Sequence, residues 1–221
     1  FEDMDDGVLG STGADAYYYV NDNGYLPRRI YPVALAEKLF GRNLNGISPD
    51  IHVSMNTDIN WYLGTDGDPG TQHDFLSILL HEIAHGLGFT GGLLVDDNGN
   101  GWNNFSGITV FDHFVETVSG QPLSDSQIFS QGSQALGDEL QSPPIYFRSP
   151  LALRELSEVP KLYIPDEWNS GSSMYHLDEV YNSKNSGRDA LMTFSSGPGQ
   201  VIHDPGPITA LMFYDMGWIH T

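Results

Sequence analysis

In the stretch DFLSILLHEIAHGLGFTGG, residues 74–92, the apolar residues recur with the period of an amphipathic helix. At about 100° per residue, His81 and His85 project within roughly 40° of each other, and the aliphatic side chains lie on the opposite side. The two imidazoles therefore face one side of the helix, while its aliphatic face anchors it from behind.

The ends of this helix are also marked in the sequence. Thr71 is the expected N-cap, with Asp74 three residues later as a short variant of the capping box. Gly86 and Gly88 are expected to end the helix, since glycine accommodates the left-handed conformation that often follows one.

Two histidines four residues apart, with a glutamate directly after the first, are typical of a catalytic zinc site. Glu82 projects about 100° away from His81, so its carboxylate lies beside the imidazole pair and reaches a water on the metal rather than the metal itself. A zinc ion with three protein ligands keeps a fourth position for water and lowers the pKa of that water toward about 7. The carboxylate of Glu82 then takes a proton and passes it to the leaving amine.

HEIAHGLGF, residues 81–89, resembles the HExxHxxG zinc helix of the metzincin metallopeptidases, in which the helix ends at the glycine matched by Gly88. The commonest form of that motif has a third histidine three residues after this glycine, where this chain has Gly91. The leishmanolysin-like branch of the metzincins instead places a long insertion before its third histidine.

The second half of the resemblance lies in residues 172–197, where His176 precedes the residues ALM in the way the late histidine of leishmanolysin-like enzymes precedes ELM. The resemblance implies that Met192 lies in a tight turn beneath the zinc. PITALMFYDMGW, residues 207–218, also looks like the segment that closes those domains.

The resemblance implies one metallopeptidase catalytic domain over residues 1–221, of α+β class. An N-terminal lobe, about residues 1–90, would hold a twisted sheet and helices including the zinc helix. An irregular C-terminal lobe, about residues 91–221, would meet it at a cleft. DIHVSMNT, residues 50–57, would be the edge strand above the cleft that pairs with an extended peptide.

The function that follows is a secreted zinc endopeptidase acting on proteins or peptides, monomeric, with one catalytic Zn²⁺. His81, His85 and His176 are its expected metal ligands, and Glu82 is the general base and acid. A zinc hydrolase of a non-peptide substrate is an alternative. A non-catalytic binding module is another, although a structural metal site needs no base.

Two residues of FDHFVETV, residues 111–118, compete with His176 for the place of third ligand. Glu116 would serve in the manner of the gluzincin peptidases, and His113 is a further candidate. The other histidines are expected to be structural or exposed, although His203 could approach the cleft from its loop; they are His52, His73, His203 and His220.

The composition excludes several partners and ligands. The chain has 9 basic and 29 acidic residues and a formal charge of −20, which repels nucleic acid and anionic membrane surfaces. It has no cysteine, so zinc must be held by histidine or carboxylate. No stretch approaches the roughly 18 apolar residues of a membrane helix, and because the sequence begins at Phe1 without a signal-like segment, a removed signal or pro-segment is expected.

Other segments predict short elements. AYYYV (16–20) and DIHVSMNT (50–57) have the composition of strands, PVALAEKLFGRN (32–43) that of a helix, and FDHFVETV (111–118) and SPLALRELSE (149–158) that of short helices.

A calcium site is a further possibility. In DDNGNG, residues 96–101, Asp96, Asn98 and Asn100 alternate before Gly101 as at the start of a calcium loop, although Gly107 stands where the distal glutamate belongs. A polar turn is the alternative interpretation.

Overall fold

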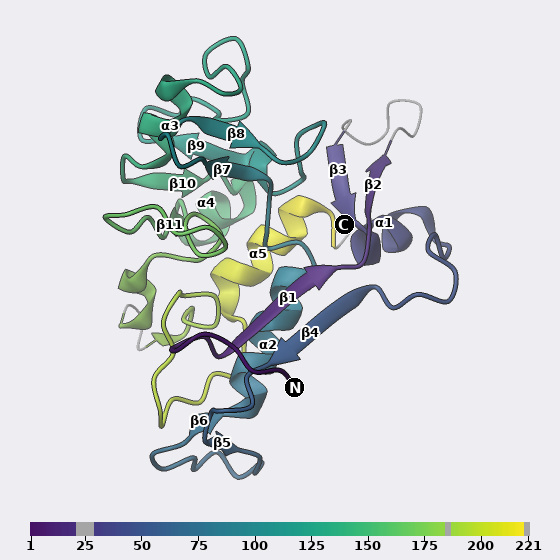
Figure 1. The fold of residues 1–221 in the computed structure, drawn as a ribbon, viewed down its shortest axis with the longest axis vertical. Coiled ribbons are helices and arrows are strands. Elements are labelled where there is room, and N and C mark those ends of the chain that lie inside the picture. The colour runs from purple at the N-terminus through teal and green to yellow at the C-terminus, as the bar shows by residue number, and fades with distance from the viewer. Residues whose placement is uncertain (21–28, 184–186, 219–221) are drawn as a thin grey trace.

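The computed structural model describes residues 1–20, 29–183 and 187–218, in which short strands and helices alternate (Figure 1). The α-helices are α1 (Val33–Phe40), α2 (Phe75–Gly86), α3 (Gln134–Leu140), α4 (Pro150–Leu156) and α5 (Gly206–Met216), and the 3-10 helices are η1 (Asp112–Phe114) and η2 (Glu179–Asn182). The strands are β1 (Gly10–Ala14), β2 (Tyr17–Val20), β3 (Arg29–Pro32), β4 (Ile51–Met55), β5 (Trp61–Tyr62), β6 (His73–Asp74), β7 (Leu93–Val95), β8 (Gly101–Asn103), β9 (Val115–Thr117), β10 (Ile145–Phe147) and β11 (Lys161–Leu162).

The strands form several small sheets. β1 pairs antiparallel with β4, β2 with β3 and β7 with β8, whereas β5 and β6 run parallel. β10 is the central strand of an antiparallel sheet with β9 and β11. Where a twisted sheet is expected in the N-terminal lobe, the described residues form separate two-stranded ribbons of strands that are two to five residues long.

The helix α2 carries the histidine pair, and its N-cap differs from the expectation. Asp74, not Thr71, caps it: the Asp74 carboxylate accepts hydrogen bonds from the backbone N–H and the hydroxyl of Ser77, at 2.8 and 2.6 Å. The prediction of Thr71 is wrong because the chain is still extended as β6 at residues 73–74. The helix ends at Gly86, as expected, and Gly88 takes a left-handed φ of 121°.

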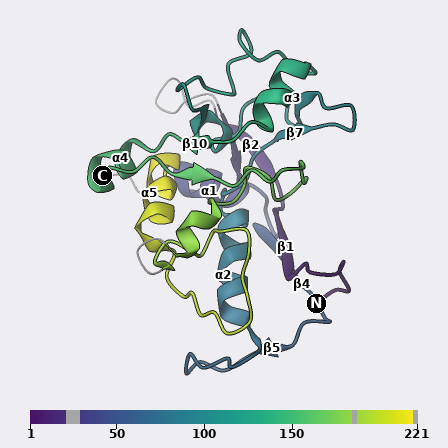
Figure 2. The ribbon, with the colours of Figure 1, turned by 90° about the vertical axis from the view of Figure 1, so that its left-hand side faces the viewer.

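Two structural layers flank α2 (Figures 1 and 2). The ribbon of β1 and β4 lies against α2, and α5 passes near its C-terminal end. There the indole N–H of Trp218 donates a hydrogen bond to the carbonyl oxygen of Leu87 at 3.0 Å. These contacts hold α2 between the N-terminal ribbon and the last helix of the chain.

An aromatic core joins the end of α2 to the C-terminal half. The rings of Phe89 and Phe111 lie 5.0 Å apart, those of Phe111 and Phe147 5.0 Å apart, and those of Phe111 and Tyr175 5.6 Å apart. All four side chains are buried. They anchor the long segment that separates His85 from His176.

Most of the expected elements are present. AYYYV and DIHVSMNT contain β2 and β4, PVALAEKLFGRN contains α1, and SPLALRELSE contains α4. FDHFVETV is not one short helix: it forms η1 and then β9, because Val115 and Thr117 are buried and pair with Phe147 and Ile145 of β10. Within the described residues, no helix is both long enough and apolar enough to cross a membrane.

Candidate metal centre

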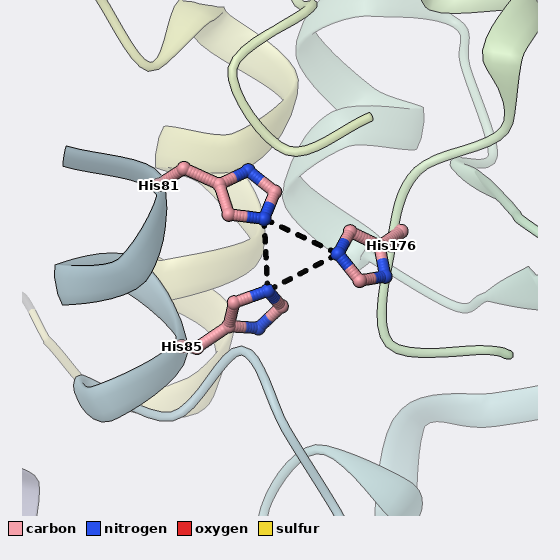
Figure 3. Close-up of side chains that lie close together, drawn as sticks. All are labelled: His81, His85 and His176. Carbon is pink, nitrogen blue, oxygen red and sulfur yellow. Dashed lines mark hydrogen bonds between the residues drawn. The ribbon is translucent and has the colours of Figure 1, made fainter. Parts of the chain in front are cut away.

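Three imidazoles converge beside α2 (Figure 3). His81 and His85 project from consecutive turns of the helix, and His176 approaches from the facing loop. The Nε2 atoms of His81 and His85 are 3.0 Å apart, those of His81 and His176 3.2 Å, and those of His85 and His176 3.3 Å. Two residues of one helix and a third that lies 91 positions later therefore share one centre.

The other nitrogen of each ring fixes its orientation. The Nδ1 atoms of His81, His85 and His176 lie 2.6, 2.8 and 2.9 Å from the carbonyl oxygens of Leu191, Phe89 and Ser172, respectively. Because a carbonyl oxygen can only accept, each Nδ1 carries the proton, and each neutral ring presents an unprotonated Nε2 to the centre. Three lone pairs that face one another cannot hydrogen-bond among themselves.

This arrangement fits a bound metal ion. Nitrogen ligands at about 2.0 Å from a tetrahedral zinc ion lie roughly 3.3 Å apart, which is close to the spacing of the three Nε2 atoms. Donation of the second ring N–H to a backbone carbonyl is also the usual support of a metal-bound histidine. The donor set of three neutral imidazoles suits Zn²⁺.

Burial keeps the three rings neutral. It lowers the pKa of His81, and together with the neighbouring imidazoles it lowers the pKa of His85 well below its usual value. Burial and the nearby His81 lower the pKa of His176 to about 3. Each ring is therefore in the form that binds a metal at neutral pH.

Glu82 directly follows His81 on α2 and is buried where the helix meets β1. Its side chain is 6% exposed, and burial raises its pKa to about 7. A Cβ atom added to Gly10 of β1 would lie 3.0 Å from Cγ and 3.1 Å from Oε1 of Glu82. The strand in contact with Glu82 is thus β1, and β4, the expected edge strand, pairs with β1 and also packs against α2.

Met192 lies in a tight turn that joins both parts of the centre. The backbone N–H of Thr193 donates to the carbonyl of Ala190 at 3.1 Å, and Met192 between them is fully buried. The carbonyl of Leu191 in this turn accepts from His81, and that of Met192 accepts from the backbone N–H of Leu177 at 2.7 Å. The turn therefore holds α2 and the segment of His176 together.

The segment around His176 has a constrained backbone. Met174 is buried and has a φ of 72°, a left-handed conformation that is uncommon for a large side chain. Backbone hydrogen bonds from Met174 N–H to the carbonyl of Tyr163, at 2.7 Å, and from Tyr163 N–H to the carbonyl of His176, at 2.9 Å, hold the segment in place. Beside it, Phe194 is 41% exposed and packs edge-on against His176, with ring centroids 5.6 Å apart.

The rival ligands lie elsewhere. Glu116 on β9 has a carboxylate oxygen 3.3 Å from Nε of Arg148. His113 in η1 packs against Phe114, and burial together with two nearby arginines lowers its pKa to about 4. Within the described residues, neither belongs to the group whose ligand atoms lie within 4.8 Å of one another.

The remaining histidines have other surroundings. The side chain of His203 contacts the N-cap residue of α2: its Nε2 is 2.6 Å from Oδ2 of Asp74. The Nε2 of His52 is 2.9 Å from Oδ1 of Asp15. His73 belongs to β6, and its ring packs edge-on against Trp61. His220 lies outside the described residues.

The segment DDNGNG forms the turn of the hairpin between β7 and β8. Oδ1 of Asp96 accepts hydrogen bonds from the backbone N–H groups of Asn98 and Asn100, both at 2.9 Å, and Oδ2 accepts from the indole of Trp102 at 2.8 Å. These bonds account for the sequence as a polar turn, and calcium binding there stays a prediction.

The comparisons with known proteins place the chain in a family. A family model described as SPBPB7E8-like matches residues 3–135, more than half of the chain. The chain belongs to the SPBPB7E8-like family. The matched part of this SPBPB7E8-like chain includes α2 with His81, Glu82 and His85, and ends before His176.

A curated relative of the SPBPB7E8-like chain is "Uncharacterized protein PB7E8.01" of Schizosaccharomyces pombe, which is 39% identical over 66 residues. The alignment covers 29% of this chain and 11% of that protein, so the chain spans a small part of the length of the relative it matches. No solved structure matches the SPBPB7E8-like chain.

Proposed function

We propose that this SPBPB7E8-like chain is a zinc-dependent endopeptidase of metzincin type, with His81, His85 and His176 as ligands and Glu82 as general base and acid. The observation that carries the proposal is the convergence of three unprotonated Nε2 atoms. A buried carboxylate, Glu82, directly follows the first of these ligands on α2. The tight turn at Met192 and the glycine that follows α2 support the same assignment.

In the proposed mechanism, the imidazoles, the carbonyl groups behind them and Glu82 have separate roles. A zinc ion held by the three imidazoles supplies Lewis acidity, which lowers the pKa of a water molecule and polarises the carbonyl group to be cleaved. The carbonyl acceptors of the Nδ1 protons keep the rings in the ligating tautomer and orientation. Glu82 accepts the proton of the attacking water and gives it to the departing amine. In the metal-free protein, burial raises the pKa of Glu82 to about 7, and a cation bound nearby would lower it toward the form that accepts a proton.

β1 is the better candidate for binding an extended substrate. Of the two strands in its ribbon, β1 is the one whose Gly10 contacts Glu82, and among the described strands it pairs with β4 along one edge. An extended peptide that paired with the other edge of β1 would bring its backbone close to the carboxylate. We further propose that the enzyme is secreted and monomeric, and that its substrates are proteins or peptides.

The test compares two Glu→Gln variants of the purified, zinc-loaded protein on a fluorogenic peptide library. Glu82→Gln should lower kcat/KM by about 100- to 10,000-fold, the usual contribution of a general base, and keep one zinc per chain. Glu155→Gln, which changes an exposed glutamate of α4 that pairs with Arg154, should retain the wild-type rate.

Each alternative predicts a different result. A wild type that cleaves only amides or esters of a small-molecule panel would identify a non-peptide hydrolase. Zinc binding without hydrolysis of any substrate, or hydrolysis that Glu82→Gln leaves unchanged, would contradict the proposed mechanism.

A further inference from the structure

The carboxylate of Asp112 in η1 is fully buried, and several donors from distant segments converge on it. Its Oδ2 accepts hydrogen bonds from the backbone N–H of Gly92 at 2.8 Å and the hydroxyl of Thr109 at 2.9 Å. Its Oδ1 lies 3.2 Å from the hydroxyl of Tyr175. Burying an unpaired carboxylate is unfavourable, so these hydrogen bonds are what make the position tolerable.

The close approach of Asp112 explains the glycine at position 91. A Cβ atom on Gly91 would lie 2.1 Å from Oδ1 and 2.6 Å from Cγ of Asp112. No side chain fits there unless the carboxylate moves. The loop that follows α2 is therefore shaped around Asp112.

Tyr175 connects this carboxylate with the metal centre, since it directly precedes His176. Its hydroxyl lies 2.9 Å from the carbonyl of Leu93 as well as 3.2 Å from Asp112, so it links β7 with η1. Its ring packs against Phe111, which packs against Phe89, the residue whose carbonyl orients His85. The buried contacts of Asp112 thus reach Tyr175, which precedes His176, and Phe89, which orients His85.

We propose that Asp112, acting through Tyr175, is a positioning residue that fixes the third imidazole against the pair on α2 and so sets the affinity of the centre for zinc. The inference rests on the proposed zinc site. Neither Asp112 nor Tyr175 touches the metal; together they hold the backbone from which His176 projects. Groups that orient metal ligands typically contribute about 10- to 100-fold to metal affinity.

The test replaces one hydroxyl at a time. Tyr175→Phe removes the hydroxyl that lies between Asp112 and the carbonyl of Leu93, and keeps the ring in the aromatic core. Tyr18→Phe is the matched control, because the hydroxyl of Tyr18 donates to a backbone carbonyl, that of Leu44, at 2.8 Å and Tyr18 lies on β2 of the N-terminal half. The zinc dissociation constant is measured by chelator competition, and the unfolding temperature of each metal-free protein is measured alongside it.

Tyr175→Phe should weaken zinc binding by about tenfold or more, while Tyr18→Phe binds zinc like the wild type even if it unfolds at a similarly reduced temperature. Asp112→Asn should weaken zinc binding further, because the amide group presents hydrogens to groups that are themselves donors. Equal zinc affinity in Tyr175→Phe, Tyr18→Phe and a zinc-binding wild type would overturn the positioning role alone. A folded wild type without zinc affinity would overturn the proposed function as well.

Discussion

The proposed metal centre combines two residues that a helix places together with one that only the tertiary fold can deliver. His81 and His85 are adjacent on α2 because of the helical repeat. His176 is held by the contact of its ring with the carbonyl of Ser172 and by the hydrogen bond from the next residue, Leu177, to the carbonyl of Met192. The loss of any one imidazole leaves zinc with two protein ligands, too few for tight binding.

His176→Ala is therefore expected to abolish tight zinc binding and peptidase activity. The variant should also gain no thermal stability from added zinc, because a ligand stabilises only a protein that binds it. Glu116→Ala, which removes the partner of Arg148, should keep one zinc per chain. Metal analysis and thermal unfolding with and without zinc measure both outcomes. The reverse pattern would make Glu116 the third ligand, as in the gluzincin peptidases.

At this scale, the sequence singled out the three imidazoles that the structure brings together, but not the groups that orient them. The i, i+4 spacing of the first two ligands follows from helix geometry, and the place of His176 followed from the resemblance to known enzymes. The acceptors of their Nδ1 protons are main-chain carbonyls, which every residue type has. A sequence therefore carries no signal for them. The proposed role of Asp112 also depends on contacts between distant segments. In the sequence, Asp112 is only the neighbour of His113, one of the two rival ligands.

The contact between β1 and α2 places one element directly against the proposed base. A side chain at Gly10 of β1 would crowd Glu82, because an added Cβ would lie 3.0 Å from its Cγ and 3.1 Å from its Oε1, so that the Glu82 side chain would have to shift by a few tenths of an ångström. Gly13 on the same strand has open space, with no atom within 4 Å of an added Cβ.

Gly10→Ala is expected to lower kcat by roughly 10- to 100-fold, since a small displacement of a catalytic group has effects of that size. Zinc content should stay at one per chain, because no ligand moves. Gly13→Ala serves as the control and should retain wild-type kinetics. Equal rates in the two variants would show that the position of Glu82 does not depend on β1.

The elements themselves were predicted unevenly. The apolar pattern located α2, and its cap was misplaced because β6 keeps the backbone extended up to Asp74. The sequence of residues 111–118 predicts a short helix, whereas Val115 and Thr117 are buried on a strand that pairs with β10. Short strands of this kind acquire their conformation from their partners, which local sequence does not specify.

For the molecule as a whole, metal-free protein should lose stability as the pH falls from 7 to 5. Burial lowers the pKa of His81, His85 and His176 in the folded state, whereas unfolded histidines have pKa values near 6.5. The unfolded chain therefore binds more protons below pH 7, and each histidine that differs fully costs about 1.4 kcal/mol per pH unit. The raised pKa values of Glu82, about 7, and Asp112, about 6, act in the opposite direction, but the three imidazoles outnumber them.

Thermal unfolding of the metal-free protein at pH 7 and pH 5 measures this balance. The Glu82→Gln variant lacks one of the opposing carboxyl groups, so its unfolding temperature should fall more steeply with pH than that of the wild type. An unfolding temperature that rises from pH 7 to pH 5 would mean that the imidazoles do not stay neutral in the fold.

The carbonyl acceptors behind the three imidazoles also determine the charge of the centre. Had those acceptors been carboxylates, three negative charges would more than cancel a divalent cation bound in front of them. Because they are neutral main-chain groups, a bound cation retains its two positive charges, opposed nearby by Glu82. In a chain with a formal charge of −20, a cation bound there would be a local positive charge that attracts the carbonyl oxygen of a substrate.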